Sequence, residues 1–393
     1  MVDLASQADL VPVYTIDLSQ PPASRYDQLI QDFRHEIANL IPLFQQVVTE
    51  AGLPLGITRR LAKLLLRRLY DPEQTEEIKG ISKTAGVELY LLVCFNTLLD
   101  LFMGCTSGGA RVRMAADSVD TQMLHFRTLD WEMESLRKVV VQLEYVKKPH
   151  GSVIARSITY AGFVGTLTGV RKDLSMSLNF RPYHNDSHST WANVRFNFHR
   201  LAVLLGLRPS IASTMRSFLL GTSPSRASLR NIEGTLPPTP CTACYLTFSD
   251  GQRTMVMEKD HVTATVNSST SFVTVTNHDI TTEGNHGKDL SNLPLLGMQD
   301  LIEESQDRLQ CIESKWQREV SAQKRRRGKA SGDEPYATPS QLIKWVNAWP
   351  TTNEATHYTT IMNPVNGEFE YIRRYLEPAQ EPVKKTRSKR HLR

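Results

Sequence analysis

The spacing of apolar residues changes at Cys105, and this change limits what the chain can fold into. Before Cys105, apolar residues recur at helical spacing over residues 23–50 and 57–70, and an apolar segment covers 89–103. After Cys105, short runs alternate apolar and polar residues, as over 138–145, which is typical of β-strands. The order predicts an α+β fold in which a helical N-terminal segment precedes two antiparallel sheets lying between helices.

The same patterns predict the organisation of the chain. We expect a helical segment over 1–104, a strand-rich domain over 105–378 with a flexible basic insertion at 321–335, and a disordered basic tail at 379–393. The expected strands cover 11–18, 138–145, 152–160, 174–179, 244–248, 253–258 and 272–276, with an extended hairpin over 111–121 and a second hairpin from 356–362 and 369–374. The expected later helices cover 191–204, 211–220, 298–320 and 341–348.

The positive charge of the chain is concentrated in two short stretches. The net charge is +5, yet eleven of the basic residues lie within 324–329 and 384–393. The rest of the chain is therefore acidic on balance, so the composition does not predict a basic folded face. This argues against a nucleic-acid partner.

Five cysteines form a sparse, odd-numbered set, which does not predict a disulfide framework. Cys241 and Cys244 form a CxxC motif without a second pair or nearby histidines. A zinc or redox role is one interpretation of this motif, and a pair of thiols at a strand edge is the favoured one. No metal and no organic cofactor are implied.

The N-terminal residues carry acids where a signal peptide needs bases, and no apolar core follows them. No window of about 18 residues is apolar enough to predict a membrane span. The expected location is the cytoplasm, with peripheral contact to membranes as an option. The helix over 57–70 has bases beside an apolar stripe, which fits either a lipid-facing surface or a helix packed on the core.

Several short motifs bring together residues that suit acyl transfer to a thiol. Cys105 follows Gly104 and a run of apolar residues, and an Arg-x-x-Asp pair, Arg127 and Asp130, lies downstream. A glycine-dense run covers 159–169. The other motifs are Leu178-Asn179-Phe180-Arg181, Val275-Thr276-Asn277-His278-Asp279, Gln306-Asp307-Arg308-Leu309 and the strand 357–362.

Together these motifs resemble the acid ceramidase and N-acylethanolamine acid amidase family of N-terminal-nucleophile hydrolases, with bile salt hydrolases as more distant relatives. The resemblance covers about 11–375 and includes a turn at 77–80. It implies an αββα sandwich in which residues 1–104 form the α-subunit. It also implies cleavage between Gly104 and Cys105, so that the two cleaved chains remain together as a heterodimer.

The resemblance also implies roles for the site residues. Cys105 would be the nucleophile, with its freed α-amine as the base. Asp130 would hold that amine, and Arg127 would orient the thiolate and lower its pKa. Asn277 and Asn179 would form the oxyanion hole. Arg308 would be a second active-site arginine, although an exposed helical arginine is the alternative. Phe180 replaces the glutamate of the ceramidases.

The expected function is hydrolysis of the amide of an N-acyl lipid, with ceramide, giving sphingosine and a fatty acid, as the first choice. Within the family the alternatives are N-acylethanolamines, other N-acyl amines, or acyl transfer to an amine. The non-enzymatic alternative is a lipid-binding protein that acts at membrane surfaces.

Overall fold

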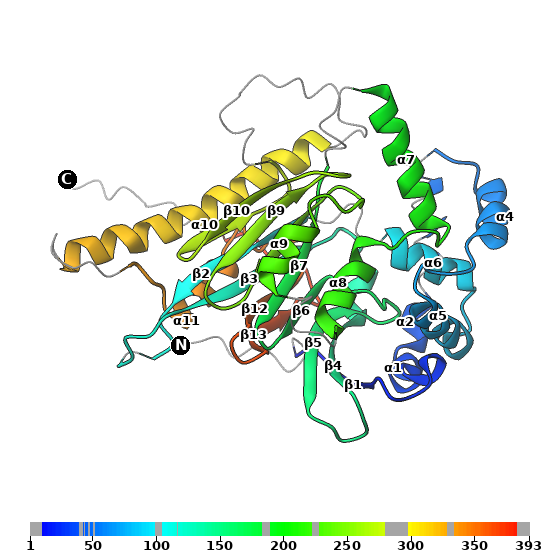
Figure 1. The fold of residues 1–393 in the computed structure, drawn as a ribbon, viewed down its shortest axis with the longest axis horizontal. Coiled ribbons are helices and arrows are strands. Elements are labelled where there is room, and N and C mark those ends of the chain that lie inside the picture. The colour runs from blue at the N-terminus through cyan, green and yellow to red at the C-terminus, as the bar shows by residue number, and fades with distance from the viewer. Residues whose placement is uncertain are drawn as a thin grey trace, which may run out of the picture.

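The computed structural model describes residues 10–382 except 39–41, 43, 46, 47, 50, 51, 99–103, 116, 183–188, 222–227, 280–297 and 328–333. Most of the predicted tail and part of the predicted basic insertion therefore lie outside the described residues. The described part contains two sheets stacked between layers of helices (Figure 1). None of its helices combines the length and the apolar character needed to cross a bilayer.

The larger sheet has eight strands and begins with a strand from the N-terminal segment. Its order is β1-β4-β5-β6-β7-β8-β9-β10. The edge pair β1–β4 is parallel, and the other pairs of this sheet are antiparallel as predicted. The strands are β1 (Val13–Asp17), β4 (Val140–Val146), β5 (Val153–Tyr160), β6 (Thr168–Arg171), β7 (Leu174–Phe180), β8 (Cys244–Ser249), β9 (Thr254–Lys259) and β10 (Ala264–Ser269).

The smaller sheet has five antiparallel strands in the order β11-β2-β3-β12-β13. The strands β2 and β3 pair as a hairpin, and the predicted extended hairpin over 111–121 corresponds mainly to the connection between them. Gly109 on β2 faces the larger sheet, and a Cβ there would lie 1.9 Å from Thr254 Oγ1. Glycine therefore allows the two sheets to approach closely. The strands are β2 (Gly104–Val112), β3 (Gln122–Asp130), β11 (Phe272–Val275), β12 (Thr356–Asn363) and β13 (Glu368–Arg374).

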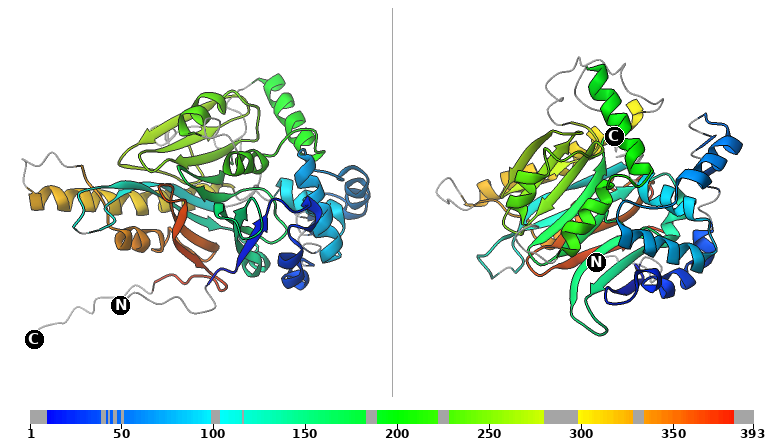
Figure 2. Two further views of the ribbon diagram at one scale, coloured as in Figure 1. Left: turned by 60° about the horizontal axis from the view of Figure 1, so that its bottom comes forward. Right: turned by 45° about the vertical axis from the view of Figure 1, so that its right-hand side comes forward.

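Helices cover the outer face of each sheet. The helix α8 packs on β5, β6 and β7, and α10 and α11 pack on β2, β3 and β11. Figure 2 shows the N-terminal helices gathered at one end of the molecule while α10 extends toward the other. The helices are α1 (Asp27–Asp32), α2 (Arg34–Ile37), α4 (Leu55–Leu65), α5 (Pro72–Ala85), α6 (Leu89–Leu98), α7 (Thr190–Leu204), α8 (Ile211–Leu220), α9 (Leu229–Thr235), α10 (Met298–Arg327) and α11 (Pro339–Val346), with short 3-10 turns at Pro22–Ser24 and Glu134–Val139.

Three local predictions were wrong. The expected helix over 23–50 is broken, because the backbone leaves helical geometry at Phe33 between α1 and α2. The expected turn at 77–80 lies inside α5, where Gly80 fits against the Ala23 carbonyl with no room for a Cβ. The helix α10 continues through the bases at 324–327, which were expected in a loop. Cations favour the C-terminal end of a helix dipole, which is consistent with this extension.

Candidate active site

Cys105 is the second residue of β2, and its side chain is fully buried. Its backbone nitrogen donates to Asn277 Oδ1 at 2.7 Å, and Arg127 Nη2 donates to its Sγ at 3.3 Å. Gly104 pairs with Asp130 across the hairpin, and a Cβ on Gly104 would lie 3.3 Å from the Asp130 Cβ. The candidate nucleophile and the residue before it therefore lie among the predicted site residues.

Arg308 reaches this site from α10 and is almost completely buried. Its Nη1 lies 3.0 Å from Asp130 Oδ2, and its Nη2 donates to Asn277 Oδ1 at 2.8 Å. Thr356 Oγ1 donates to the other oxygen of Asp130 at 2.6 Å. Both carboxylate oxygens of Asp130 thus have partners, and the alternative of an exposed Arg308 does not hold.

Arg127 connects the two sheets at the nucleophile. Besides Sγ of Cys105, its guanidinium donates from Nη1 to Asn179 Oδ1 at 2.9 Å. Ser107 on β2 also donates to Asn179 Oδ1, at 3.1 Å. Asn179 lies near the end of β7 in the larger sheet, so this hydrogen-bond network fixes the separation of the sheets beside Cys105.

Both asparagines turn their amide oxygens toward donors and their nitrogens toward backbone carbonyls. Asn277 Nδ2 donates to the Phe180 carbonyl at 2.7 Å, and Asn179 Nδ2 donates to the Thr276 carbonyl at 3.2 Å. Asn179 Nδ2 also donates to the Val275 carbonyl, at 3.4 Å. The oxyanion role of Asn277 and Asn179 stays a prediction. What the uncut chain shows is that Asn277 Oδ1 binds the nitrogen of Cys105.

The electrostatic surroundings of Cys105 act in opposite directions. Burial raises the pKa of the Cys105 thiol, and the negative charge of Asp130 raises it further. The positive charges of Arg127 and Arg308 lower it. The net direction is upward. In the uncut chain the group is therefore held as a thiol, and the adjacent guanidinium is positioned to stabilise a thiolate once the proton leaves.

Sequence reasoning missed the residues that support this site. Ser305 on α10 accepts from the Asn277 nitrogen at 2.7 Å, and Arg181 binds the carboxylate of Asp279 at 2.6 and 2.9 Å. Arg181 and Asp279 each stand two residues after a site asparagine, so the ion pair joins the two loops that follow Asn179 and Asn277. Both residues are the last of the motifs 178–181 and 275–279, and this position was the signal that could have found them.

The glycine-dense run packs beside α6, the last described helix before Cys105. Asn96 on α6 accepts from the Val164 nitrogen at 2.8 Å and donates to the Gly162 carbonyl at 3.0 Å. At the start of the run, Tyr160 OH lies 2.9 Å from Nδ1 of the buried His357. The predicted role of the run in shaping a substrate pocket stays a prediction.

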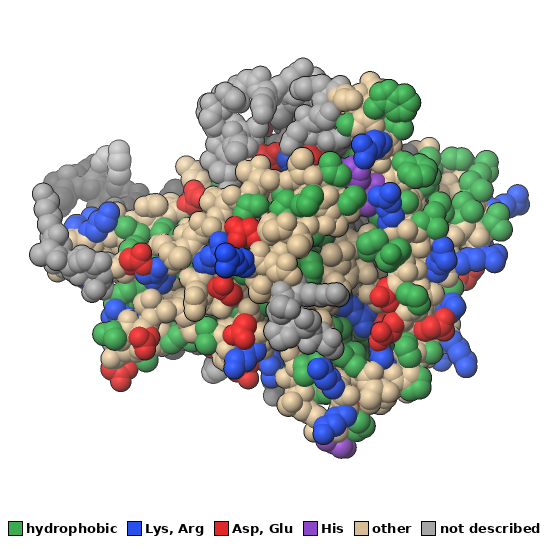
Figure 3. Space-filling model, viewed as in Figure 1, with side chains coloured by type: hydrophobic (Ala, Val, Ile, Leu, Met, Phe, Trp, Pro, Cys, Tyr) green, Lys and Arg blue, Asp and Glu red, His purple; other side chains and the backbone are tan. Residues whose placement is uncertain are grey.

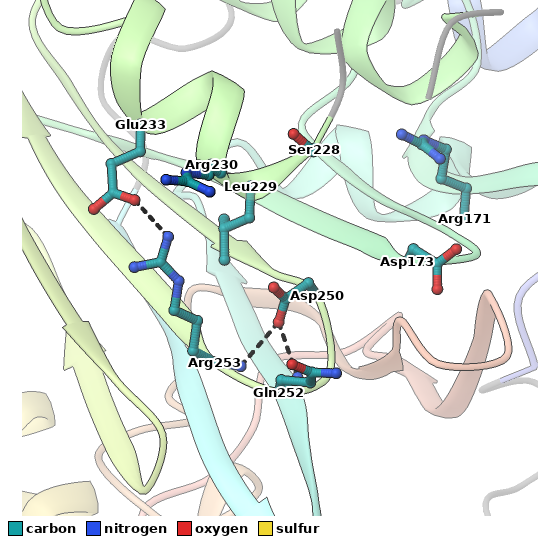
Figure 4. A pocket seen from close by; sticks show the side chains of 9 residues that line it. All are labelled: Arg171, Asp173, Ser228, Leu229, Arg230, Glu233, Asp250, Gln252 and Arg253. Atoms are coloured by element: carbon teal, nitrogen blue, oxygen red, sulfur yellow. Dashed lines mark hydrogen bonds and ion pairs between the residues drawn. The ribbon is translucent and has the colours of Figure 1, made fainter. Parts of the chain in front are cut away.

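A surface pocket lies beside the turns that join β6 to β7 and β8 to β9 (Figure 4). It is formed around Asp173 in the β6–β7 turn, Asp250 near the β8–β9 turn and Ser228 before α9. The site asparagine Asn179 lies near the other end of β7. Charged side chains of both signs line the pocket, and Arg253 pairs with Glu233 there. The pocket contains none of the predicted site residues.

Comparisons with known proteins agree with the motifs. A family model for the beta subunit of N-acylethanolamine-hydrolyzing acid amidase matches residues 9–70. A Caenorhabditis elegans protein of the same name is 28% identical over 43% of this chain and 47% of its own length. The acid ceramidase of Heterocephalus glaber is 26% identical over 44% of this chain and 46% of its own length. The chain thus spans about half the length of these curated relatives.

The solved structure of a Caenorhabditis elegans N-acylethanolamine-hydrolyzing acid amidase ortholog also matches, with a TM-score of 0.44 and 20% identity. The match covers 66% of this chain and 93% of that one.

The described fold agrees with the predicted fold class. Two sheets between helix layers, with a buried cysteine beginning a central strand, form the α+β sandwich predicted for an N-terminal-nucleophile hydrolase. The sequence matches support the family resemblance: the chain is similar to acid ceramidases and to N-acylethanolamine-hydrolyzing acid amidases.

Proposed function

We propose that the chain is a self-processing cysteine amidase that hydrolyses the amide bond of N-acyl lipids. The observation that carries the proposal is the setting of Cys105, whose thiol faces Arg127 and whose nitrogen is held by Asn277. The relatives named above are an N-acylethanolamine-hydrolyzing amidase and an acid ceramidase, which supports an N-acyl amide as the substrate class.

Maturation begins when Cys105 Sγ attacks the Gly104 carbonyl. The acyl group moves from nitrogen to sulfur, the C–N bond breaks, and the nitrogen of Cys105 gains a proton to become a free amine. Water then opens the thioester, giving a carboxylate on Gly104 and restoring the thiol. After this cleavage the freed α-amine of Cys105 can act as the base in turnover. Its pKa is near 7.7–8.0 in model peptides, so a useful fraction is neutral at mild pH and can take the thiol proton.

In turnover, the same thiol attacks the substrate carbonyl, and the α-amine protonates the leaving amine. Water hydrolyses the acyl-enzyme. Asn277 Oδ1 and Asp130 are placed to hold the α-amine, because the first binds the nitrogen of Cys105 and the second lies beside Gly104. Arg308 bridges these two residues and so fixes their relative positions.

The proposed substrate is ceramide, with N-acylethanolamines as the alternative. The buried Phe180 stands where the ceramidases carry a glutamate, and it contributes its backbone carbonyl to Asn277. A panel of ceramides, N-acylethanolamines and bile-acid conjugates, assayed with and without an added amine acceptor, separates these substrates and separates hydrolysis from acyl transfer. Release of fatty acid from ceramide faster than from the other substrates is the expected result.

The first test is maturation of the full chain. Mass spectrometry should find a fragment that begins at Cys105, and a denaturing gel should show two bands. Cys105→Ala should give one band and no turnover. A wild-type chain that turns over substrate at full rate with an intact backbone would contradict the mechanism, and an intact, inactive chain that binds lipid would favour the non-enzymatic alternative.

The cleaved chains are expected to stay together as a heterodimer. The strand β1 completes the edge of the larger sheet by pairing with β4 over five residues. On α5, the fully buried carboxylate of Glu77 binds Arg216 of α8, with one contact at 2.7 Å, and also binds Arg25. Removing one partner of such a buried pair is costly, so the fragments should elute together without denaturant.

We also propose that the protein contacts lipid surfaces through α4 and α7. On α4, the residues Ile57, Leu61 and Leu64 form a stripe that is more than half exposed, so this apolar face does not pack on the core. On α7, Trp191 and Phe198 are also more than half exposed and form a second apolar stripe. Figure 3 shows apolar and basic side chains mingled on this side of the molecule.

Such a combination suits the boundary between lipid headgroups and acyl chains. Both helices contact α6, which leads toward Cys105. Sedimentation with phosphatidylcholine vesicles, with and without phosphatidylserine, should show binding that Leu61→Ser and Trp191→Ser weaken. Val119→Ser, which alters an exposed residue between β2 and β3, is the matched control. Equal binding by all three variants would contradict the lipid surface.

A further inference from the structure

Cys241 and Cys244, the CxxC pair, lie in a buried corner beside the site. Neither forms a disulfide, both are buried, and the Cys244 thiol is in hydrogen-bonding contact with Cys241. His261 contacts both backbone polar groups of Cys241. The Cys241 nitrogen donates to the His261 carbonyl at 3.0 Å, and His261 Nδ1 lies 3.3 Å from the Cys241 carbonyl. The backbone of Cys241 is therefore fixed by His261, and its thiol lies close enough to Cys244 for a side-chain contact.

A buried cation accompanies the pair. Lys259 is fully buried, and its ammonium donates to the carbonyls of Asp260 at 2.5 Å and His261 at 3.2 Å. The hydrogen bond from Cys244, followed by the charge of Lys259, lowers the pKa of Cys241 despite burial. A thiol with these neighbours gains thiolate character, and the thiolate is the form that oxidants attack.

Strand pairing and hydrogen bonds link this corner to Cys105. Cys244 opens β8, where its register partners are Phe180 on β7 and Lys259 on β9. The Phe180 carbonyl accepts from Asn277, whose other amide atom holds the nitrogen of Cys105. A change in the backbone at Cys244 therefore reaches Cys105 through two intervening residues.

We propose that Cys241 and Cys244 form a reversible disulfide when the protein meets a small hydroperoxide, and that this disulfide slows turnover at Cys105. The Cys241 thiolate attacks an oxygen of the hydroperoxide, the O–O bond breaks, and the leaving oxygen takes up the thiol proton. Cys244 Sγ then attacks the Cys241 sulfenic sulfur, the S–O bond breaks, and the departing hydroxide leaves as water with the Cys244 proton. The two cysteines lose two electrons, and the peroxide gains them.

The chemical test uses the full chain and hydrogen peroxide, followed by alkylation of free thiols under denaturing conditions and peptide mass spectrometry. The expected result is loss of the two free thiols as one internal disulfide, restored by dithiothreitol. The Cys105→Ala chain should form the same disulfide, because the pair does not depend on the nucleophile. Thiols at 241 and 244 that both remain alkylatable, that become protected by added Zn²⁺ alone, or that form only sulfinic acid would overturn the proposal.

The effect on turnover rests on the proposed function and is measured separately. Peroxide should lower kcat of the wild type with little change in KM, and dithiothreitol should restore it. Cys241→Ser and Cys244→Ser should match wild type before oxidation and lack this reversible loss, which distinguishes it from oxidation of Cys105 itself. A disulfide that forms without any difference in turnover between wild type and these variants would overturn the coupling. Disulfide formation in a chain with no amidase activity would instead count against the proposed function alone.

Discussion

The two faces of strand β3 show how one strand serves two purposes. Alternate residues His125 and Arg127 face the larger sheet, where they bind Ser175, Ser177 and Asn179. Their neighbours Leu124 and Phe126 face α10 and α11, in a cluster that includes Trp316 and Leu342.

The difference follows from the period of two in a β-strand, which separates the faces residue by residue. Polar groups buried between the sheets are expensive unless each has a partner, so that layer is fixed by hydrogen bonds. Around Phe126 the outer layer is an apolar cluster, with Phe126 stacked on Phe272 and Phe272 stacked on Trp316. Changes on the inner face should therefore affect chemistry, and changes on the outer face should affect stability.

The largest effect on the inner face is expected from Cys105→Ala. Both self-cleavage and turnover should fall to background, because no other described thiol occupies the site. The free energy of unfolding should change little, since the substitution removes one sulfur from a layer held by other contacts. Thermal unfolding of the variant, compared with uncut wild type, checks the separation. A collapse of stability would show that the two faces are not independent.

On the outer face, Phe126→Ala should lower the free energy of unfolding by ~3–5 kcal/mol, the range for deleting a buried aromatic ring. The molecules that fold should still cleave themselves, because Arg127 on the other face keeps its contacts. Urea unfolding gives the first quantity, and the fraction of cleaved chain in the folded pool gives the second. A Phe126→Ala chain that is as stable as wild type but fails to cleave itself would contradict the assignment of stability to the outer face and chemistry to the inner face.

Returning to the inner layer, Asn277→Ala should cost ~10²–10³ in kcat, the range for one oxyanion donor, with KM nearly unchanged. The loss of the contact between Asn277 and the nitrogen of Cys105 should also slow maturation. The measurement is steady-state kinetics on mature enzyme, normalised by titration of the Cys105 thiol. A kcat close to wild type would remove Asn277 from the chemistry and leave Asn179 as the candidate donor.

The smallest predicted effect concerns His125, whose pKa is lowered by burial to about 3. Its neutral form is favoured in the folded chain, so its contribution is fully present above the unfolded pKa near 6.5 and is lost as pH falls toward 3. As pH falls from roughly 6 to 4, the free energy of unfolding of the wild type should decrease more steeply than that of His125→Gln. The difference between the two slopes should be ~1.4 kcal/mol per pH unit. Urea unfolding across that range checks this, with His150→Gln at an exposed loop as the control.

The sequence motifs named residues that the fold brings together, but they did not predict the contacts of these residues. Local motifs identified Cys105, Arg127 and Asn277 because short-range order is visible in one dimension. The partners of Asp130 were not visible, since Thr356 lies 226 residues away and its approach depends on the pairing of β3 with β12.

The same limit applied to the elements. Regular alternation predicted β4 and β7, but β6 has only four residues, and β10 is largely exposed and weakly apolar, so neither gave a clear period. The orientation of the two asparagine amides was also beyond prediction, because it depends on which backbone carbonyls and arginines the folded chain brings to them.

The edge position of β1 has a consequence for the lifetime of the protein. The uncut chain can fold with β1 attached, so its partner strand is always supplied by the same molecule. Once the proposed cut is made, a denatured pair of fragments must find each other again, and the recovery of structure depends on concentration. The mature form would then persist because its unfolding is slow, not because refolding is easy, and heating that separates the fragments should be irreversible.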